Sequence, residues 1–94
     1  MSAAVQIPVA IPMLLGNTTG GAREVVVSGA TLQEALEDLL RQYPLLRVHL
    51  YDGGALRKHV LILFNGQNTR WFETLDMPVK AGDAVTILQA VSGG

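Results

Sequence analysis

The chain has 94 residues, 49% of them hydrophobic, and its seven lysines and arginines against eight aspartates and glutamates leave a formal net charge of −1. This size predicts a single small domain, and the missing basic excess argues against nucleic acid as a partner. The chain contains no cysteine, which excludes disulfides, thiolate metal sites and thiol nucleophiles. The longest apolar stretch, residues 7–15, is too short for a membrane span and follows no basic cluster, so we expect a cytoplasmic protein without membrane or export signals.

The first two elements are predicted to be strands of one hairpin. Apolar residues occupy every second position from Val5 to Met13, which is the period of a half-buried strand. Regular pairing is expected to end near Pro12, which has no N–H for the ladder, and residues 16–21 are expected to turn the chain. The second strand is predicted at residues 23–28, antiparallel to the first.

A capping box predicts the start of the main helix at Thr31. A glutamate follows three residues later, so the hydroxyl and the carboxylate can satisfy free amides of the first turn. Apolar residues then recur at three- and four-residue spacing up to Tyr43, and Pro44 is expected to end the helix. Glu37 and Arg41 have the spacing of an exposed ion pair.

The middle of the chain is predicted to contain a second hairpin. Residues 45–58 show no regular period, and Asp52-Gly53-Gly54 is expected to be a turn or flexible loop. Residues 60–64 form a continuous run of strand-forming residues followed by Asn65-Gly66, a preferred two-residue hairpin turn. The return strand is therefore expected at residues 68–71.

A last strand is predicted at residues 84–89, after a turn at 81–83. The element order β-β-α-β-β-β predicts an α+β fold in which a mixed sheet of four to five strands packs on one main helix. Trp71 is expected in the core or at its edge.

No spacing of polar residues predicts catalysis by the chain itself. His49 and His59 lack a further ligand at metal-binding spacing, so we expect no bound metal. The glycine pairs are not followed by the lysine and Ser/Thr of a phosphate-binding loop, and no serine stands in a Gly-x-Ser-x-Gly elbow. We therefore expect a protein that is not an enzyme and has neither intrinsic catalytic residues nor a bound cofactor.

The C-terminal end offers a different kind of chemistry. Residues 89–94 are small and uncharged, and they follow the last strand directly. Gly93 and Gly94 have no Cβ, so such a tail can lie in a narrow channel and present its carboxylate to a nucleotide without steric hindrance. A carboxylate is a poor electrophile, so this use requires an ATP-consuming partner enzyme. The alternative is a frayed tail without chemistry.

Five segments and their order carry a resemblance to a known family. They are residues 29–36 at the helix start, Tyr43-Pro44 at its end, Asn65-Gly66 after the third strand, residues 82–88, and the terminal Gly93-Gly94. Together they resemble the ubiquitin-like β-grasp sulfur carrier proteins of the ThiS and MoaD family. The resemblance implies a β-grasp domain over residues 1–90 and a flexible tail over residues 91–94.

The family's chemistry would take place at Gly94. The resemblance implies that an E1-like enzyme adenylates its carboxylate with ATP and that a sulfur donor displaces AMP to leave a thiocarboxylate. Gly20-Gly21, Asp52-Gly53-Gly54 and residues 65–70 are most similar to MoaD-like and CysO-type carriers. Gln89, where carriers often have proline, leaves open which partner enzyme fits.

The recipient of the sulfur also follows only from the resemblance. In the CysO-type branch, our first choice, the thiocarboxylate attacks an activated serine derivative on a pyridoxal-phosphate-dependent cysteine synthase, and a metalloprotease then frees cysteine. In the molybdopterin branch the chain would be the small subunit of a synthase and would bind its large subunit.

Strand alternation nominates a docking surface for these partners. If Val60 and Ile62 face the helix, Leu61 and Leu63 face away, and so does Leu88 on the last strand. We expect these three leucines, with the tail residues Val91 and Ser92, to contact the adenylating enzyme; the alternative is a sheet buried on both faces or against residues 45–58.

Two other functions remain open. Gly94 can instead be joined to lysines of target proteins, which would make the chain a ubiquitin-like protein modifier. The chain can also be a β-grasp interaction module whose tail does no chemistry.

Overall fold

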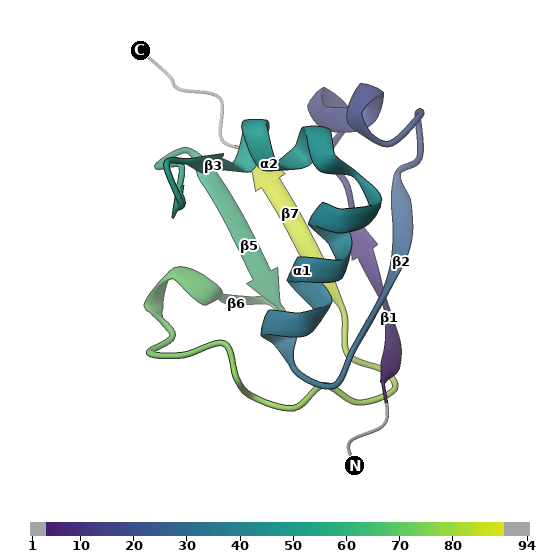
Figure 1. Ribbon diagram of the computed structural model, residues 1–94, viewed down its shortest axis with the longest axis vertical. Helices are drawn as coiled ribbons and strands as arrows, with labels where there is room; N and C mark the ends of the chain where they lie inside the picture. Colours follow the sequence, from purple (N-terminus) through teal and green to yellow (C-terminus); the bar gives the residue numbers. More distant parts are fainter. Residues whose placement is uncertain (1–3, 90–94) are drawn as a thin grey trace.

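The computed structural model describes residues 4–89; residues 1–3 and 90–94 lie outside the described part, and with them the predicted tail. A five-stranded sheet has the order β2-β1-β7-β5-β6 (Figure 1). Its strands are β1 (Val5–Ala10), β2 (Glu24–Gly29), β5 (Val60–Phe64), β6 (Gln67–Asn68) and β7 (Val85–Gln89). β1 and β7 are parallel and the other neighbours antiparallel, so the predicted mixed sheet is confirmed.

Helices α1 (Leu32–Gln42) and α2 (Pro44–Leu50) both lie on one face of this sheet (Figure 1). Two short strands, β3 (Tyr51–Asp52) and β4 (Ala55–Leu56), pair with each other after α2. Two 3₁₀ helices, η1 (Met13–Thr18) and η2 (Thr69–Trp71), complete the elements. No helix within residues 4–89 is long and apolar enough to span a bilayer.

The first hairpin is confirmed, and its regular pairing ends at Ala10, close to Pro12 as predicted. Residues 13–18 form η1, so the turn predicted at residues 16–21 covers only residues 19–21. Met13 is exposed, and Leu15 is the residue that enters the core. The period of two breaks here because Pro12 cannot donate to a ladder and stands at the N-cap of η1.

The predicted start of α1 is confirmed with Thr31 at the N-cap, but the glutamate bonds one residue before the cap. Thr31 Oγ1 accepts from Glu34 N at 3.2 Å, and the Glu34 carboxylate accepts from Ala30 N at 2.8 Å. The amides of Leu32 and Gln33 donate to carbonyl oxygens at residues 77 and 75, at 3.0 and 2.8 Å. The first three amides of the helix are thus satisfied, and the bonds to residues 75 and 77 attach the loop before β7 to the helix.

The predicted ion pair between Glu37 and Arg41 is wrong. Arg41 pairs with Asp38 at 3.2 Å, while Glu37 accepts a hydrogen bond from Gln33. Asp38 is the better partner because it is already held in place: it accepts from Ser28 N at 2.9 Å and from the Gln42 side chain. These hydrogen bonds lower the pKa of Asp38, the one from Ser28 most.

Two predictions in the middle of the chain are corrected. Residues 44–50 form α2, because Pro44 ends α1 and also occupies the first turn of a second helix, where its missing N–H costs nothing. The return strand covers only Gln67–Asn68, because the Asn68 side chain accepts from Arg70 N and starts η2. Trp71, expected at the core, is 78% exposed as a result.

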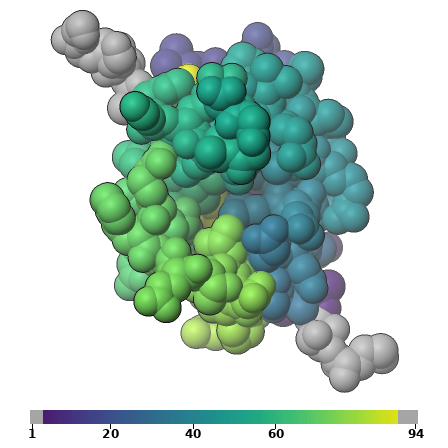
Figure 2. Space-filling model, turned by 60° about the vertical axis from the view of Figure 1, so that its left-hand side comes forward, coloured from purple at the N-terminus to yellow at the C-terminus, as the bar shows by residue number. Residues whose placement is uncertain are grey.

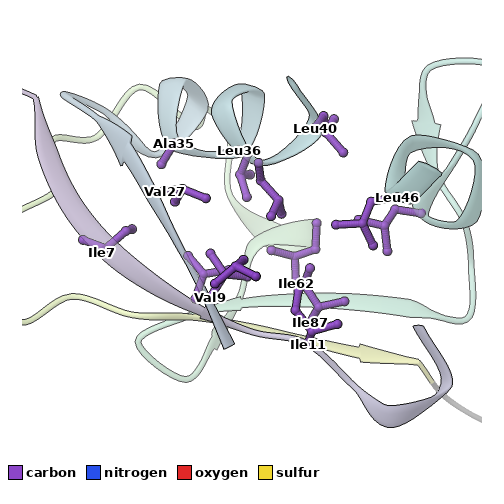
Figure 3. Close-up of a cluster of buried hydrophobic side chains, with 14 of the residues drawn as sticks. Ile7, Val9, Ile11, Val27, Ala35, Leu36, Leu40, Leu46, Ile62 and Ile87 are labelled. Atoms are coloured by element: carbon purple, nitrogen blue, oxygen red, sulfur yellow. The ribbon is translucent and has the colours of Figure 1, made fainter. Parts of the chain in front are cut away.

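One core lies between the sheet and the two helices (Figure 3). β1, β2, β5 and β7 contribute every second residue, and the helices contribute their inward faces. The labelled members are Ile7, Val9, Ile11, Val27, Ile62 and Ile87 from the sheet side and Ala35, Leu36, Leu40 and Leu46 from the helices. The open face of the sheet is therefore the one that carries no helix.

Replacing Gly29 by alanine is expected to destabilise the domain by about 1–3 kcal/mol. A Cβ at this position would lie 2.5 Å from Ala35 N and 2.9 Å from the Glu34 carbonyl carbon, so α1 would have to move away from β2. Urea denaturation measures the change in the free energy of unfolding. Gly16→Ala is the control, since its Cβ meets nothing within 4 Å; equal stability of the two variants would contradict the close approach of α1 to β2.

Candidate functional site

The predicted reactive end of the chain continues from strand β7. Gln89 is the last residue described, and the predicted site residues 91–94 lie outside the described residues. β7 lies between β1 and β5 in the sheet, with Gln89 opposite Val60. Val85 and Ile87 are buried beneath α1 and α2. Residues 90–94 therefore continue from a strand that pairs with β1 at its start and with β5 along its whole length.

A polar network holds the start of β7. The Asp83 carboxylate accepts from Lys80 N at 2.8 Å and from Asn65 Nδ2 at 3.0 Å. Asn65 Oδ1 in turn accepts from Ala84 N at 2.9 Å. Asn65 has a φ of 51° and Gly66 one of 84°, the left-handed pair of the predicted hairpin turn. Hydrogen bonds of the Asn65 and Asp83 side chains thus connect the β5–β6 turn with the residues that precede β7.

The same network predicts how the Asp83→Asn variant responds to pH. The hydrogen bond from Lys80 N and then that from Asn65 lower the pKa of Asp83. A carboxylate whose pKa is lowered by folding stabilises the fold above its unfolded pKa of about 3.9, and this contribution is lost as the pH falls below that value. Asp83→Asn should therefore be less stable than the wild-type chain at neutral pH, with a difference that shrinks below about pH 4.

Urea denaturation at a series of pH values measures this effect. Asp76→Asn is the matched control, because Asp76 is exposed and lies in the same loop. A stability difference between Asp83→Asn and the wild-type chain that stays constant from neutral to acid pH would contradict the assignment.

The three predicted docking leucines share the open face of the sheet. Leu61 pairs with Leu88, and Leu63 pairs with Thr86 of β7. Val60 and Ile62 are buried on the opposite face, as the alternation predicted. Leu88 is 41% exposed, and Leu61 and Leu63 are partly exposed. The alternative of a sheet buried on both faces is therefore wrong for these positions, and the three leucines form one surface.

Sequence reasoning did not extend to the rest of the open face, across β1 and β2, which lies outside the surface of the three leucines. Ala10 pairs with Thr86 in the parallel register, and Pro8 pairs with Val26. Val26 is 51% exposed. Val26 lies between the buried Val25 and Val27, so the alternation of β2 alone would have predicted that its side chain faces away from the core.

The described residues hold no other cluster suited to chemistry. His49 is exposed on α2, and residues 4–89 contain no group of three His, Asp or Glu side chains that can bind a metal ion. Two adjoining cavities of about 410 and 340 Å³ beside α1 share Leu36, Tyr51 and Leu75. Arg70 borders the larger one, but its guanidinium donates to the carbonyl oxygens of residues 57 and 60. Its role in these contacts is structural.

Comparison with known proteins agrees with this reading of the fold. The sulfur carrier protein CysO of Mycobacterium tuberculosis is 37% identical over 93 residues, which cover 96% of this chain and all of CysO. The crystal structure of the Amycolatopsis orientalis BexX/CysO complex contains a chain with a TM-score of 0.79 and 33% identity, covering 94% of this chain and 99% of that one.

A modifier protein has a similar structure. The solution structure of small archaeal modifier protein 1 from Methanosarcina acetivorans has a TM-score of 0.78 and 29% identity, over 98% of this chain and 99% of that one. These matches confirm the predicted β-grasp class, since the alignments cover nearly the whole of each chain. A model of the ThiS family matches residues 14–94, which include the terminal diglycine. The chain therefore belongs to the ThiS family and is a homologue of the sulfur carrier CysO.

Proposed function

We propose that this sulfur carrier homologue works through the carboxylate of Gly94. The carboxylate oxygen attacks the α-phosphorus of ATP on an E1-like enzyme, pyrophosphate leaves, and an acyl adenylate forms. A sulfur donor then attacks the carbonyl carbon and expels AMP, which leaves a C-terminal thiocarboxylate. The chain itself supplies no catalytic group and binds no cofactor; ATP belongs to the activating partner.

The observation that carries this proposal is the position of β7. β1 pairs with its first two residues and β5 with its whole length up to Gln89, which is five residues before Gly94. Five residues span at most about 17 Å when fully extended, so the terminal carboxylate stays close to a rigid base. A partner that binds the domain therefore also positions its reacting group.

The acceptor of the sulfur is proposed from the relatives. The CysO proteins at 37% identity make a cysteine-type pathway the first choice, with the thiocarboxylate attacking an activated serine derivative on a pyridoxal-phosphate enzyme and a metalloprotease freeing cysteine. Molybdopterin synthesis is the next choice. The partners would be the adenylating enzyme, the sulfur donor and one of these acceptors.

The absence of cysteine makes the test unusually clean. The full-length chain is incubated with ATP, sulfide and the E1-like enzyme of the same organism, then treated with a thiol alkylating reagent, and its intact mass is measured. The chain has no thiol of its own, so any alkylation reports the thiocarboxylate. A chain lacking Gly94 and a reaction without ATP are the controls.

The expected result is the mass gain of oxygen-to-sulfur exchange plus that of the added alkyl group, in the full-length chain alone. An unchanged mass with an E1-like enzyme that forms the adenylate of another carrier would contradict the proposal.

The similarity to a small archaeal modifier protein favours one second candidate, conjugation of Gly94 to lysines of other proteins. An isopeptide-linked adduct in the same incubation, supplemented with protein from the host, would identify that function. Full biological activity of a chain without Gly93 and Gly94 would instead support an interaction module.

A further inference from the structure

Four large apolar side chains stand exposed on η1 and α2. Met13 and Leu14 on η1, and Leu45 and Val48 on α2, are each at least 60% exposed. The two elements pack against each other, and their inward residues, among them Leu15 and Leu46, are buried in the core. We call Met13, Leu14, Leu45 and Val48 the exit rim. Monomeric domains seldom expose such a group of side chains without a partner for it.

The exit rim lies beside the end of β7. Gln89 pairs with Val60, whose amide donates to the Arg57 carbonyl oxygen at 3.1 Å. Arg57 donates in turn to α2, from its backbone amide to Leu50 O at 2.8 Å and from Nε to Val48 O at 3.1 Å. Three steps of backbone contact therefore connect the last described residue with α2.

η1 reaches the same end of the molecule from the other side. β1 runs parallel to β7, with Ala10 opposite Thr86, and continues into η1. Figure 1 shows η1 and α2 at the end of the sheet where the β7 arrow ends, and Figure 2 shows both elements at that end of the surface. The exit rim thus lies at the end of the sheet from which residues 90–94 continue.

The segment 47–59, which includes part of α2, is positively charged, whereas the rest of the chain is negatively charged. Residues 47–59 hold three basic side chains and one acidic one, a formal charge of +2, whereas the remainder has four basic and seven acidic side chains, a formal charge of −3. Arg47 and Lys58 are exposed, and both histidines lie in the same segment. An apolar group bordered by basic side chains fits a partner with an apolar hollow and an acidic border.

We infer that the exit rim is a contact surface for the enzyme that adenylates Gly94, and that this enzyme places an apolar hollow against the rim and acidic side chains against Arg47 and Lys58. The inference rests on the proposed function. Gly94 lies at most about 17 Å beyond Gln89, so an enzyme that encloses its carboxylate must approach the surface around the end of β7. The rim is separate from Leu61, Leu63 and Leu88, which lie on the open sheet face.

The test measures the adenylation step by ATP–pyrophosphate exchange with the E1-like enzyme that thiocarboxylates the wild-type chain. Leu45→Asp and Val48→Asp should each lower kcat/KM about tenfold, mainly through KM, because each places a charge in an apolar contact that has to lose its water. Trp71→Asp is the matched control: Trp71 is more exposed than any rim residue but stands on η2 beside β5. It should keep the wild-type kcat/KM.

The charged border has a separate readout. Raising the salt concentration from about 0.1 M to about 1 M shortens the screening length from about 10 Å to about 3 Å and should lower the wild-type kcat/KM. The double variant Arg47→Gln and Lys58→Gln should start lower and lose this salt dependence, because it removes both charges from the border. Thermal unfolding shows whether each variant remains folded.

Two results would overturn the inference while the proposed function stands: folded Leu45→Asp and Val48→Asp chains with wild-type kcat/KM, or a wild-type kcat/KM that does not change with salt. Failure of the wild-type chain to be adenylated at all would contradict the proposed function itself, and the inference with it.

Discussion

Replacing Gly93 by valine is expected to lower the rate of adenylation of Gly94 at least about 100-fold, the cost of misplacing a reacting group by about an ångström. The variant keeps its terminal carboxylate, but the Cβ and its methyl groups widen the tail and restrict its backbone, so it no longer fits a narrow channel. The stability of the domain should not change, because the buried core residues lie between Ile7 and Ile87.

ATP–pyrophosphate exchange and the alkylation assay measure this loss, and urea denaturation measures the stability. Gly93→Ala is the graded control and should lie between valine and the wild-type chain. Wild-type rates for Gly93→Val would contradict a narrow channel, and alkylation of a chain that lacks Gly94 would contradict the terminal residue as the site.

The second large effect is expected on the open face of the sheet. We propose that Leu61, Leu63 and Leu88 contact the adenylating enzyme, together with Val91 and Ser92 of the tail. Leu88→Asp and Leu63→Asp should then lower kcat/KM for adenylation by about 10- to 100-fold, because each places a charge in an interface that has to lose its water. Leu88 is the cleaner site, since it is 41% exposed and its side chain contributes less to folding.

Val26→Asp is the matched control for this surface. Val26 is apolar and 51% exposed, but it lies on β2, the edge strand that β1 and β7 separate from β5. It should keep kcat/KM within about a factor of two. Normal folding and undiminished adenylation of Leu63→Asp and Leu88→Asp would remove the open face as the docking surface.

Local signals predicted most of the fold. The Thr31 hydroxyl and the Glu34 carboxylate accept hydrogen bonds from backbone amides at the start of α1, and Asn65-Gly66 adopts the left-handed turn. Both motifs were predictable because they act within a few residues. The predicted alternation of residues 60–64 is also confirmed, because a strand with one buried face can pair in only one register.

The errors lie where a segment's structure depends on what it packs against. α2 has only two buried residues, Leu46 and Leu50, and its one period of helical spacing is too short to recognise in a sequence. η1 interrupts an apparently regular strand because Leu15 enters the core there. Arg41 pairs with Asp38 and not with Glu37, because the backbone amide of Ser28 on β2 donates to the Asp38 carboxylate and holds it in place.

The candidate site divides in the same way. The orientation of Leu61, Leu63 and Leu88 was predictable from the sequence, because it follows from local alternation. The chemistry that we propose for the diglycine end stays a prediction from the sequence. The exit rim was not, because its residues come from separate segments, 13–14 and 45–48, that meet only when η1 packs against α2.

Sequence reasoning alone predicted the order of α1 and the five strands of the main sheet, the boundaries of α1, the second hairpin turn and the group through which we propose that the chain reacts. These depend on hydrogen bonds and side-chain periods within a few residues, so no distant contact can easily override them. Only the tertiary structure decided that β7 lies between β1 and β5, that α2 and η1 adjoin its end, and that the basic segment 47–59 lies there too. Those features arise from long-range burial of apolar surface, which brings together residues that no local pattern connects.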